Sequence, residues 1–418
     1  MFDTDFWQEI LQTIRRNRWR SLMTAFGVFW GLLMLILLVG VGRGLERGMM
    51  SFVTDIPANS VLMGTGYTTL PYQGFRKGRY WTLENDDLGF LRREFGDAIR
   101  TLSPMNFAGS ADCAAGQKTG EFSVVGITAA YLTAMPQQML YGRYVNEIDQ
   151  RERRKVCVIG RKVYETLFTP GTDPCGHLLK AGAVYYTVVG VAQQKNDQFT
   201  IGTDVDESLL IPLSTAQLTY GQGQTLHMLG VTLHDHCDAE AYEARISAAL
   251  KQRHFVDPQD PGAMWSFNMA EMIGMYAALF LGISVLIWIV GAGTLLAGLI
   301  GISNIMLVTV RERTQEIGIR RALGARPRTV MAQILSESLV LTGTAGIAGL
   351  VLGIWVLALV GRIQEANPDP SAMFGNPQIP VGVAVAALVI LTVGGVVAGW
   401  MPARRAMKIR AIEALREE

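Results

Sequence analysis

Four long apolar runs constrain this chain more than any other feature of its sequence. They cover residues 22–41, 272–310, 330–360 and 381–401, and the only charge in them is Glu337. A bilayer core about 30 Å thick needs about 20 apolar residues in a helix, so we expect four transmembrane helices. The second run would be about 58 Å long as one helix, and we therefore expect it to continue beyond the bilayer.

Basic residues near the ends of these runs predict their orientation. They gather at 15–20, 311–328 and 404–410, whereas the stretch between the third and fourth runs has only Arg362. Basic segments remain in the cytoplasm, so both termini should be cytoplasmic. The first run is longer than the ~7–15 residues of a signal-peptide core and no small-x-small site follows, so we expect a retained helix.

The expected organisation follows from these spans. An amphipathic helix on the cytoplasmic face (1–20) is indicated by apolar residues at helical spacing, although this segment could equally be the start of the first span. The remaining parts are a first span (21–43), an outside domain (44–271), a second span with a stalk (272–310), a cytoplasmic segment (311–328), a third span (329–361), an outside loop (362–380), a fourth span (381–402) and a cytoplasmic tail (403–418).

The outside domain is expected to be α+β. β-branched and aromatic runs at 122–127, 155–160 and 183–191 predict strands, and 82–95 and 238–253 have helical patterns. All four cysteines (Cys113, Cys157, Cys175 and Cys237) fall here, where disulfides are permitted. Cys157 lies in an apolar run, which favours a buried free thiol at this position. The sequence does not choose between the possible disulfide pairings.

Small residues recur four apart within the spans, a spacing that lets helix backbones approach closely in lipid. Glycine is also common in membrane helices without such a role. The candidate packing residues are Gly27, Gly31, Ala297, Gly301, Gly349, Gly353, Gly395 and Gly399.

Patterns typical of catalysis are missing. The sequence has no G-x-x-x-x-G-K-[ST], G-x-S-x-G or H-E-x-x-H motif, so we expect no catalytic residue, no metal site and no cofactor bound by this chain itself. His234 and His236 would share one face of a strand and could hold a metal, but a polar turn is the simpler reading. The net charge of +1 does not favour nucleic acid as a partner.

Glu337 is the one acid within a predicted span. An intramembrane acid is a functional candidate by default. Near the cytoplasmic end, it could instead reach an interfacial arginine.

The segment ERTQEIGIRRALGA (312–325) is expected to form a short amphipathic helix between the second and third spans. Glu316 and Arg320 have the favourable order for an i,i+4 ion pair, and Gly324 is a good helix stop. Ile319, Ala322 and Leu323 would form an apolar ridge that suits a groove on a partner protein. A solvated loop or a helix on the lipid surface are the alternatives.

This segment resembles the cytoplasmic signature of the FtsX-like permease family, the MacB and LolC type of ABC transporter. The likeness extends over nearly the whole chain, through RNRWRSLMTAFGVFWG at 16–31, TLSP at 101–104, VCVIG at 156–160, YTVVGV at 186–191 and MPARRAMKIRAIEALREE at 401–418. The family usually has a proline before IEAL, where this chain has Ala411.

The resemblance implies a permease subunit of the bacterial inner membrane, without an ATPase of its own, in contact with membrane lipid. A P-loop ATPase, which binds ATP and magnesium, would dock on a coupling helix and move the long second helix. The implied coupling residues are Glu312, Arg313, Glu316, Ile317, Gly318, Ile319, Arg320, Arg321, Ala322, Leu323, Gly324 and Ala325.

Two permease chains, identical or different, would form the working unit. In the MacB branch the outside domain also carries an inserted tip, expected here near 105–215. A periplasmic adaptor and an outer-membrane duct are further implied partners for export from the periplasm or the outer leaflet. Lipoprotein extraction of the LolC type and an FtsX-like scaffold for a cell-wall hydrolase are the alternatives, and a membrane-anchored enzyme is disfavoured by the missing motifs.

Overall fold

The structure is a computed structural model that describes residues 18–51, 56–194, 204–366 and 374–407. Most of the predicted amphipathic helix (1–20) and of the predicted tail (403–418) lies outside these residues. The chain divides into two compact units, one made of Met1–Met49 with Ala278–Glu418 and the other of Met50–Ala277. We describe each unit separately.

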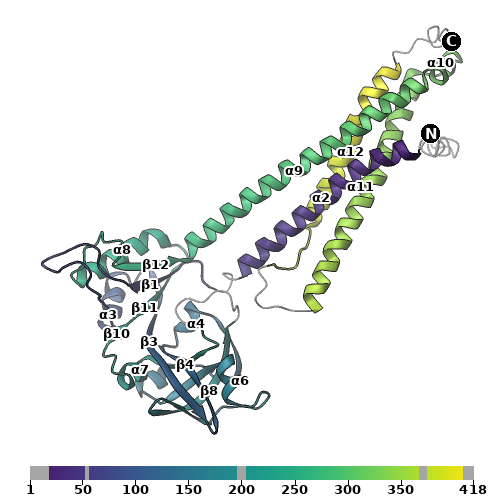
Figure 1. Ribbon diagram of the computed structural model, residues 1–418. Coiled ribbons are helices and arrows are strands. Elements are labelled where there is room, and N and C mark those ends of the chain that lie inside the picture. Colours follow the sequence, from purple (N-terminus) through teal and green to yellow (C-terminus); the bar gives the residue numbers. More distant parts are fainter. Residues whose placement is uncertain (1–17, 52–55, 195–203, 367–373, 408–418) are drawn as a thin grey trace. The chain divides into compact units, whose positions relative to one another are not determined.

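Long helices make up the first unit (Figure 1). They are α2 (Arg18–Ser51), α9 (Met269–Glu312), the short α10 (Thr314–Ala322), α11 (Pro327–Ala366) and α12 (Val381–Met407). Four of them are long and apolar enough to cross a membrane, as the apolar runs predict. Each is longer than its predicted span, because the helices continue past the apolar residues at one or both ends.

Contacts between backbones hold this bundle together. Gly27 and Gly31 of α2 lie against the backbone of α9, where a side chain at Gly31 would come within 3.2 Å of Thr294. Gly349 and Gly353 of α11 lie against the other side of α2. Because lipid provides little hydrophobic drive between helices, such close approach is a main source of their association.

The fourth long helix, α12, packs mainly on α11. A side chain at Gly395 would come within 3.1 Å of Thr342, and one at Gly399 within 2.9 Å of Ser338. The Ser338 hydroxyl also donates a hydrogen bond of 2.9 Å to the Gly395 carbonyl. Both glycine pairs on α11 and α12 therefore lie at helix contacts.

The expected pair Ala297 and Gly301 on α9 does not lie at a helix contact within the described chain. Ala297 is exposed, and a side chain at Gly301 would meet no atom of the described chain within 4 Å. Gly298 makes the contact instead, with its added Cβ 3.0 Å from the Gly27 backbone. Neighbouring positions on a helix point about 100° apart, so the expected pair lies on a different face of α9 from the contact with α2.

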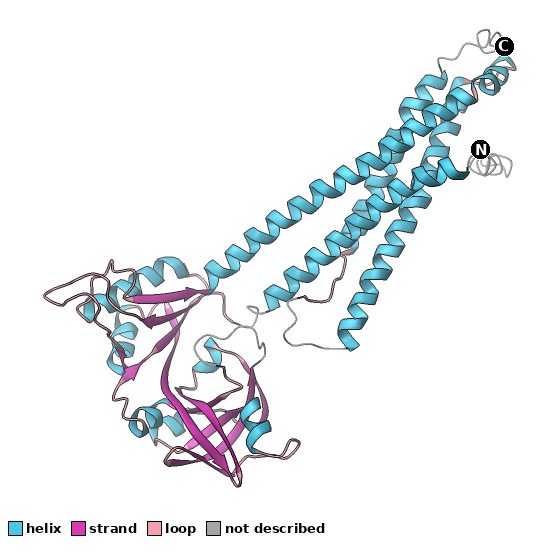
Figure 2. Ribbon diagram, in the orientation of Figure 1, coloured by secondary structure: helices cyan, strands magenta, loops and turns pink. Residues whose placement is uncertain are grey.

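The second unit is an α+β domain (Figure 2). Its strands are β1 (Ser60–Thr65), β2 (Leu83–Glu84), β3 (Ile99–Ala115), β4 (Lys118–Ile127), β5 (Gln137–Gly142), β6 (Val156–Gly160), β7 (Leu178–Ala181), β8 (Val184–Gln194), β9 (Ser208–Pro212), β10 (Thr225–Leu226), β11 (Met228–Leu233) and β12 (Met264–Asn268). Its helices are α3 (Asn85–Glu94), α4 (Tyr131–Ala134), α5 (Glu147–Arg151), α6 (Arg161–Leu167), α7 (Leu213–Thr219) and α8 (Ala239–Arg253).

One sheet runs through the domain in the order β12-β1-β11-β3-β4-β9-β6-β8-β5, and β7 pairs with both β3 and β8. The strands β3, β4, β9, β6, β8 and β7 therefore close into a ring. β3 belongs to both the ring and the open part of the sheet. Its register shifts between Phe107 and Gly109, where Gly109 has a φ of +94°, so a bulge lets the strand bend from one part into the other.

The three strands expected from the sequence correspond to β4, β6 and β8, of which β6 and β8 begin one residue later than expected. The helix expected over 238–253 is α8, capped by Asp238. The helix expected over 82–95 begins only at Asn85, because the two residues before it pair with β10 as β2. The ring strands lie between Ile99 and Pro212, but Met50–Ala277 is one compact unit, so a separate tip at 105–215 stays a prediction.

A buried carboxylate joins α3 to the end of α8. Asp87 is 1% exposed and accepts hydrogen bonds of 2.9 Å from Arg253 Nε and 2.8 Å from the Glu84 N–H, while His254 Nε2 lies 2.8 Å away. Burial raises the pKa of Asp87, but the hydrogen bonds to His254, the Glu84 backbone and Arg253 outweigh it, and the net pKa lies below the ordinary value.

Candidate functional site

The expected short helix between the second and third spans is α10, and its start is set by a break after α9. α9 continues to Glu312, so this residue belongs to the long helix and not to the short one. Arg313 has φ −100° and ψ 16°, outside the helical range. The Thr314 hydroxyl then donates a hydrogen bond of 2.8 Å to the Arg311 carbonyl at the end of α9. The chain therefore turns at Arg313.

The end of α10 is a Schellman motif. Gly324 has a φ of +97°, the Gly324 N–H donates to the Arg321 carbonyl at 3.1 Å, and the Ala325 N–H donates to the Arg320 carbonyl at 3.0 Å. α11 begins two residues later at Pro327, whose missing N–H costs nothing at a first helical position. The predicted glycine stop is confirmed.

The inner face of α10 is apolar and fixed to the bundle. Ile317 and Gly318 are buried, and Ile317 belongs to the same hydrophobic cluster as Val310, Val330 and Ile334. The Arg321 side chain donates a hydrogen bond of 2.9 Å to the Met407 carbonyl at the end of α12. α10 therefore rests on α9, α11 and α12, and its orientation is defined by all three.

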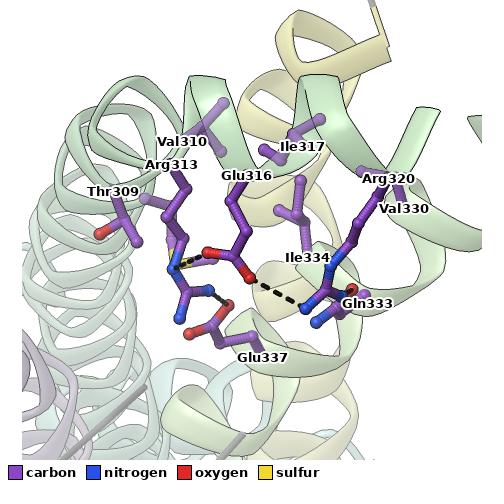
Figure 3. Close-up of a pocket in the computed structure, with 11 residues that line it drawn as sticks. Thr309, Val310, Arg313, Glu316, Ile317, Arg320, Val330, Gln333, Ile334 and Glu337 are labelled. Atoms are coloured by element: carbon purple, nitrogen blue, oxygen red, sulfur yellow. Dashed lines mark hydrogen bonds and ion pairs between the residues drawn. The ribbon is translucent and has the colours of Figure 1, made fainter. Parts of the chain in front are cut away.

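Charged side chains form a network beside this apolar contact (Figure 3). Arg320 Nη2 lies 2.9 Å from Glu316 Oε1, which confirms the predicted i,i+4 pair. Glu316 Oε2 lies 4.0 Å from Arg313 Nε, and Arg313 Nη1 lies 3.7 Å from Glu337 Oε2 on α11. Arg320 Nη1 also donates to Gln333 Oε1 on α11 at 3.3 Å.

A small cavity lies among these groups, with a volume of about 30 Å³. It is lined by the five polar side chains of the network together with apolar residues of α9, α10 and α11. This volume holds about one or two water molecules, and the polar lining offers the several partners that such a water needs. The cavity is therefore suited to water rather than to a transported molecule.

The outer face of α10 is open. Ile319 is 43% exposed and Leu323 84% exposed, and Gln315 and Ala322 on the same side are also exposed. The expected apolar ridge thus points away from the bundle. A short helix with a fixed inner face and an open apolar outer face can bind a groove on another protein.

Glu337 lies where the ion-pair alternative placed it. It is 5% exposed and faces Arg313 across the turn between α10 and α11. The sequence suggested an interfacial arginine but did not identify which one, and it gave no sign of Gln333. Gln333 and Glu337 become neighbours of α10 only because the Schellman motif folds α11 back against it.

Other sequence candidates lie in the α+β domain. His234 and His236 lie in the turn between β11 and α8, with ring centroids 5.8 Å apart. No group of three or more His, Cys, Asp or Glu side chains that could hold a metal occurs in the part of the chain that the structure describes.

The four cysteines are free. Cys113 and Cys157 are buried within the ring of strands, as predicted for Cys157. Burial raises the pKa of the Cys113 thiol to about 12 and raises that of Cys157 as well. These two thiols are therefore protonated and poorly reactive at neutral pH.

Two family models match the chain. The MacB-like periplasmic core domain matches residues 21–249, and the FtsX-like permease C-terminal region matches residues 288–411, which include α10.

Curated relatives match almost the whole chain. It is 28% identical over 408 residues to the macrolide export ATP-binding/permease protein MacB of Bdellovibrio bacteriovorus, covering 97% of this chain and 61% of that protein. It is 30% identical over 403 residues to the pyoverdine export ATP-binding/permease protein PvdT of Pseudomonas putida, covering 96% and 58%. The chain spans only about three fifths of the length of these relatives.

Among solved structures, the periplasmic region of MacB from Actinobacillus actinomycetemcomitans aligns with a TM-score of 0.43 and 18% identity. The alignment covers 53% of this chain and 94% of that structure.

Proposed function

This chain belongs to the family of ABC transporter permeases that combine a MacB-like periplasmic core domain with an FtsX-like C-terminal region, and from that premise we propose that α10 is the docking site of an ABC-type ATPase. This proposal rests mainly on the exposed apolar ridge of Ile319 and Leu323, because the inner face of the same helical segment is packed against the bundle. In this proposal the partner binds ATP and magnesium and hydrolyses ATP, and the helices of this chain transmit the resulting motion.

The mechanism rests on how α10 is connected. Arg313 joins it directly to α9, a single uninterrupted helix of 44 residues, about 66 Å long at about 1.5 Å per residue. The far end of α9 follows β12 of the α+β domain without an intervening residue. If the ATPase displaces α10, it therefore moves one end of α9, and the other end of α9 transmits this motion to the α+β domain.

Export from the periplasm is the activity that we propose for the complex. One relative is named for macrolide export and another for pyoverdine export. We carry over the direction of transport and a small-molecule cargo. A periplasmic adaptor and an outer-membrane duct complete the pathway, with this chain in the inner membrane and α10 on the cytoplasmic side.

The basic residues around α10 support this orientation, because basic segments remain in the cytoplasm. They include Arg311 before the helix and Arg326 and Arg328 after it.

The docking site is tested by pull-down with matched variants. The wild-type chain is cross-linked lightly in native membranes, extracted in mild detergent, and searched for a P-loop ATPase. Leu323→Asp should lose that ATPase, because a charge would enter the apolar contact. Leu178→Asp is the control, since Leu178 is a 61% exposed leucine of β7.

The docking proposal is refuted if Leu323→Asp retains the ATPase as well as Leu178→Asp does. The same sample separates the alternatives. A co-purifying adaptor supports export, whereas a lipoprotein carrier or a cell-wall hydrolase in its place indicates lipoprotein extraction or a signalling scaffold.

We further propose that α9 packs against a second permease chain through Ala297 and its small neighbours. Side chains at Gly293 or Gly301 would meet no atom of the described chain within 4 Å, so this face is open to another helix. Ala297→Cys should form a disulfide-linked dimer on oxidation in the membrane. Val397→Cys on α12, also exposed, is the control, and equal cross-linking of the two variants would exclude this interface.

A further inference from the structure

Two polar contacts join the α10 region to the first turns of α11 (Figure 3). Arg320 Nη1 donates to Gln333 Oε1 at 3.3 Å, and Arg313 Nη1 lies 3.7 Å from Glu337 Oε2. Gln333 and Glu337 are four apart, so they lie one above the other on the same face of α11. Glu316 lies between the two arginines and pairs with both. The contacts form a single connected clamp.

Glu337 is the least exposed charged member of this clamp. At 5% exposed, its carboxylate has lost most of its contact with water, which is unfavourable unless a cation compensates. Arg313 is a cation facing it, and Arg313 is also the residue at which α9 ends and α10 has not yet begun. The pair therefore acts on the joint between the two helices.

The position of the pair has a mechanical consequence. Ile317 packing, the Arg321–Met407 hydrogen bond and the Arg320–Gln333 contact hold α10 itself, whereas the Arg313–Glu337 pair acts on the residue that joins α10 to α9. Next to Glu337, Ser338 donates a hydrogen bond of 2.9 Å to the Gly395 carbonyl of α12. A force on the joint can thus pass from α10 to α11 and from there to α12.

We infer that Glu337 is a positioning residue for coupling: through Arg313 it holds the joint between α9 and α10 against α11, so that a push on α10 moves α11 as well as α9. This inference rests on the proposed function, because it assumes that an ATPase moves α10. It adds a second path for the motion besides α9.

The first test measures the clamp in the full-length chain in nanodiscs, without any ATPase. Hydrogen exchange of the α10 amides is compared for the wild type, Glu337→Gln, Arg313→Gln and the double variant Arg313→Gln/Glu337→Gln. Glu337→Gln keeps the side-chain volume and removes only the charge. Both single variants should exchange about tenfold faster, because each removes the 3.7 Å ion pair with the nearly buried Glu337 carboxylate. The double variant should exchange no faster than Arg313→Gln, because both lack the same contact.

Arg328→Gln is the matched control, since it removes a positive charge from an exposed position in the first turn of α11. If the α10 amides of Arg328→Gln exchange at the wild-type rate, the faster exchange of the Glu337 and Arg313 variants is due to the clamp and not to the loss of any charge near α10. If Glu337→Gln also exchanges at the wild-type rate, the inference is overturned.

The second test uses the ATPase that co-purifies with the wild-type chain. Glu337→Gln should bind this ATPase with unchanged affinity but alter the kcat of ATP hydrolysis by the complex at least about fivefold, because binding uses the outer face of α10 and transmission uses the inner one. The double variant Arg313→Gln/Glu337→Gln should change kcat no further than Arg313→Gln does, because both lack the same ion pair.

Loss of ATPase binding by Glu337→Gln, or an unchanged kcat, contradicts a role in transmission. If instead no ATPase binds the wild-type chain, the proposed function fails while the exchange measurements still report on the clamp. The two failures are therefore distinguishable.

Discussion

Gly349 provides a direct test of how the helix bundle is held together. It lies on α11 at the contact with α2, where an added Cβ would come within 2.6 Å of the Phe29 carbonyl oxygen. Gly343 lies on the same helix, and an added Cβ there would meet no atom of the described chain within 4 Å. Gly349→Ala and Gly343→Ala are therefore chemically identical changes in two different surroundings.

The magnitude follows from the difference between the two sites. Carbon and oxygen atoms approach to about 3.3 Å even in close contacts, so the helices at Gly349 must separate by roughly 0.7 Å. A gap of that size forfeits about a quarter to a half of the dispersion attraction across it, and overpacking costs about 1–3 kcal/mol in general. Both variants gain about 1 kcal/mol of helix propensity, which cancels in the comparison.

The assay is thermal denaturation of the full chain in detergent, followed by the fraction that remains monodisperse. A loss of about 1–3 kcal/mol corresponds to a Tm roughly 2–12 °C lower for Gly349→Ala than for Gly343→Ala, at about 2–4 °C per kcal/mol. The reasoning is refuted if Gly349→Ala melts at or above the temperature of Gly343→Ala. That result would mean that α2 and α11 do not depend on backbone contact.

Further predictions concern the charges and thiols. Folding lowers the pKa of Asp87, so the ionised carboxylate stabilises the folded chain at neutral pH, and this contribution is lost as the pH falls below about 4 through the folded-state pKa. Asp87→Asn should remove this part of the pH dependence of the free energy of unfolding, measured by denaturant titration at several pH values. In the folded chain at pH 7.5, a maleimide should label the partly exposed Cys237 and leave Cys113 unlabelled until denaturant is added, as mass spectrometry can show. Glu316→Arg or Arg320→Glu should lower ATP-driven function at least about tenfold with normal membrane levels, and the double exchange should recover part of it. The i,i+4 pair alone contributes about 0.3–0.5 kcal/mol to a helix, but Arg320 also bonds Gln333 of α11 and Glu316 also pairs with Arg313. Full activity in the single variants, measured as ATP-dependent export, would show that this pair is not needed for coupling.

Several features of the fold are local properties and could be predicted from the sequence. The four spans follow from long apolar runs with at most one charge, because a helix satisfies the backbone polar groups of such a run in lipid. The end of α10 before Gly324 and the start of α11 at Pro327 follow from the φ values that these two residues allow. The Glu316–Arg320 pair follows from helical spacing alone.

Features that depend on contacts between distant segments were not predictable in this way. The sequence identified small residues on α9, but the contact with α2 is made by Gly298, one position from Ala297. A single position rotates a helix face by about 100°, and the crossing of two helices decides which face is used. The closing of the ring by β7, which pairs with β3 and β8, likewise depends on strands far apart in the chain.

The candidate site shows the same division. Its proposed docking face was visible in the sequence as the ridge of Ile319 and Leu323, because amphipathic periodicity is a local pattern. The clamp beneath it was not, because Arg313 and Glu337 meet only after the chain has reversed at Gly324 and α11 has packed against α10. The sequence by itself thus determined that the four long helices exist and where α10 stops. The tertiary structure decided which of their side chains meet, since those contacts depend on helix rotation and crossing that no local pattern encodes.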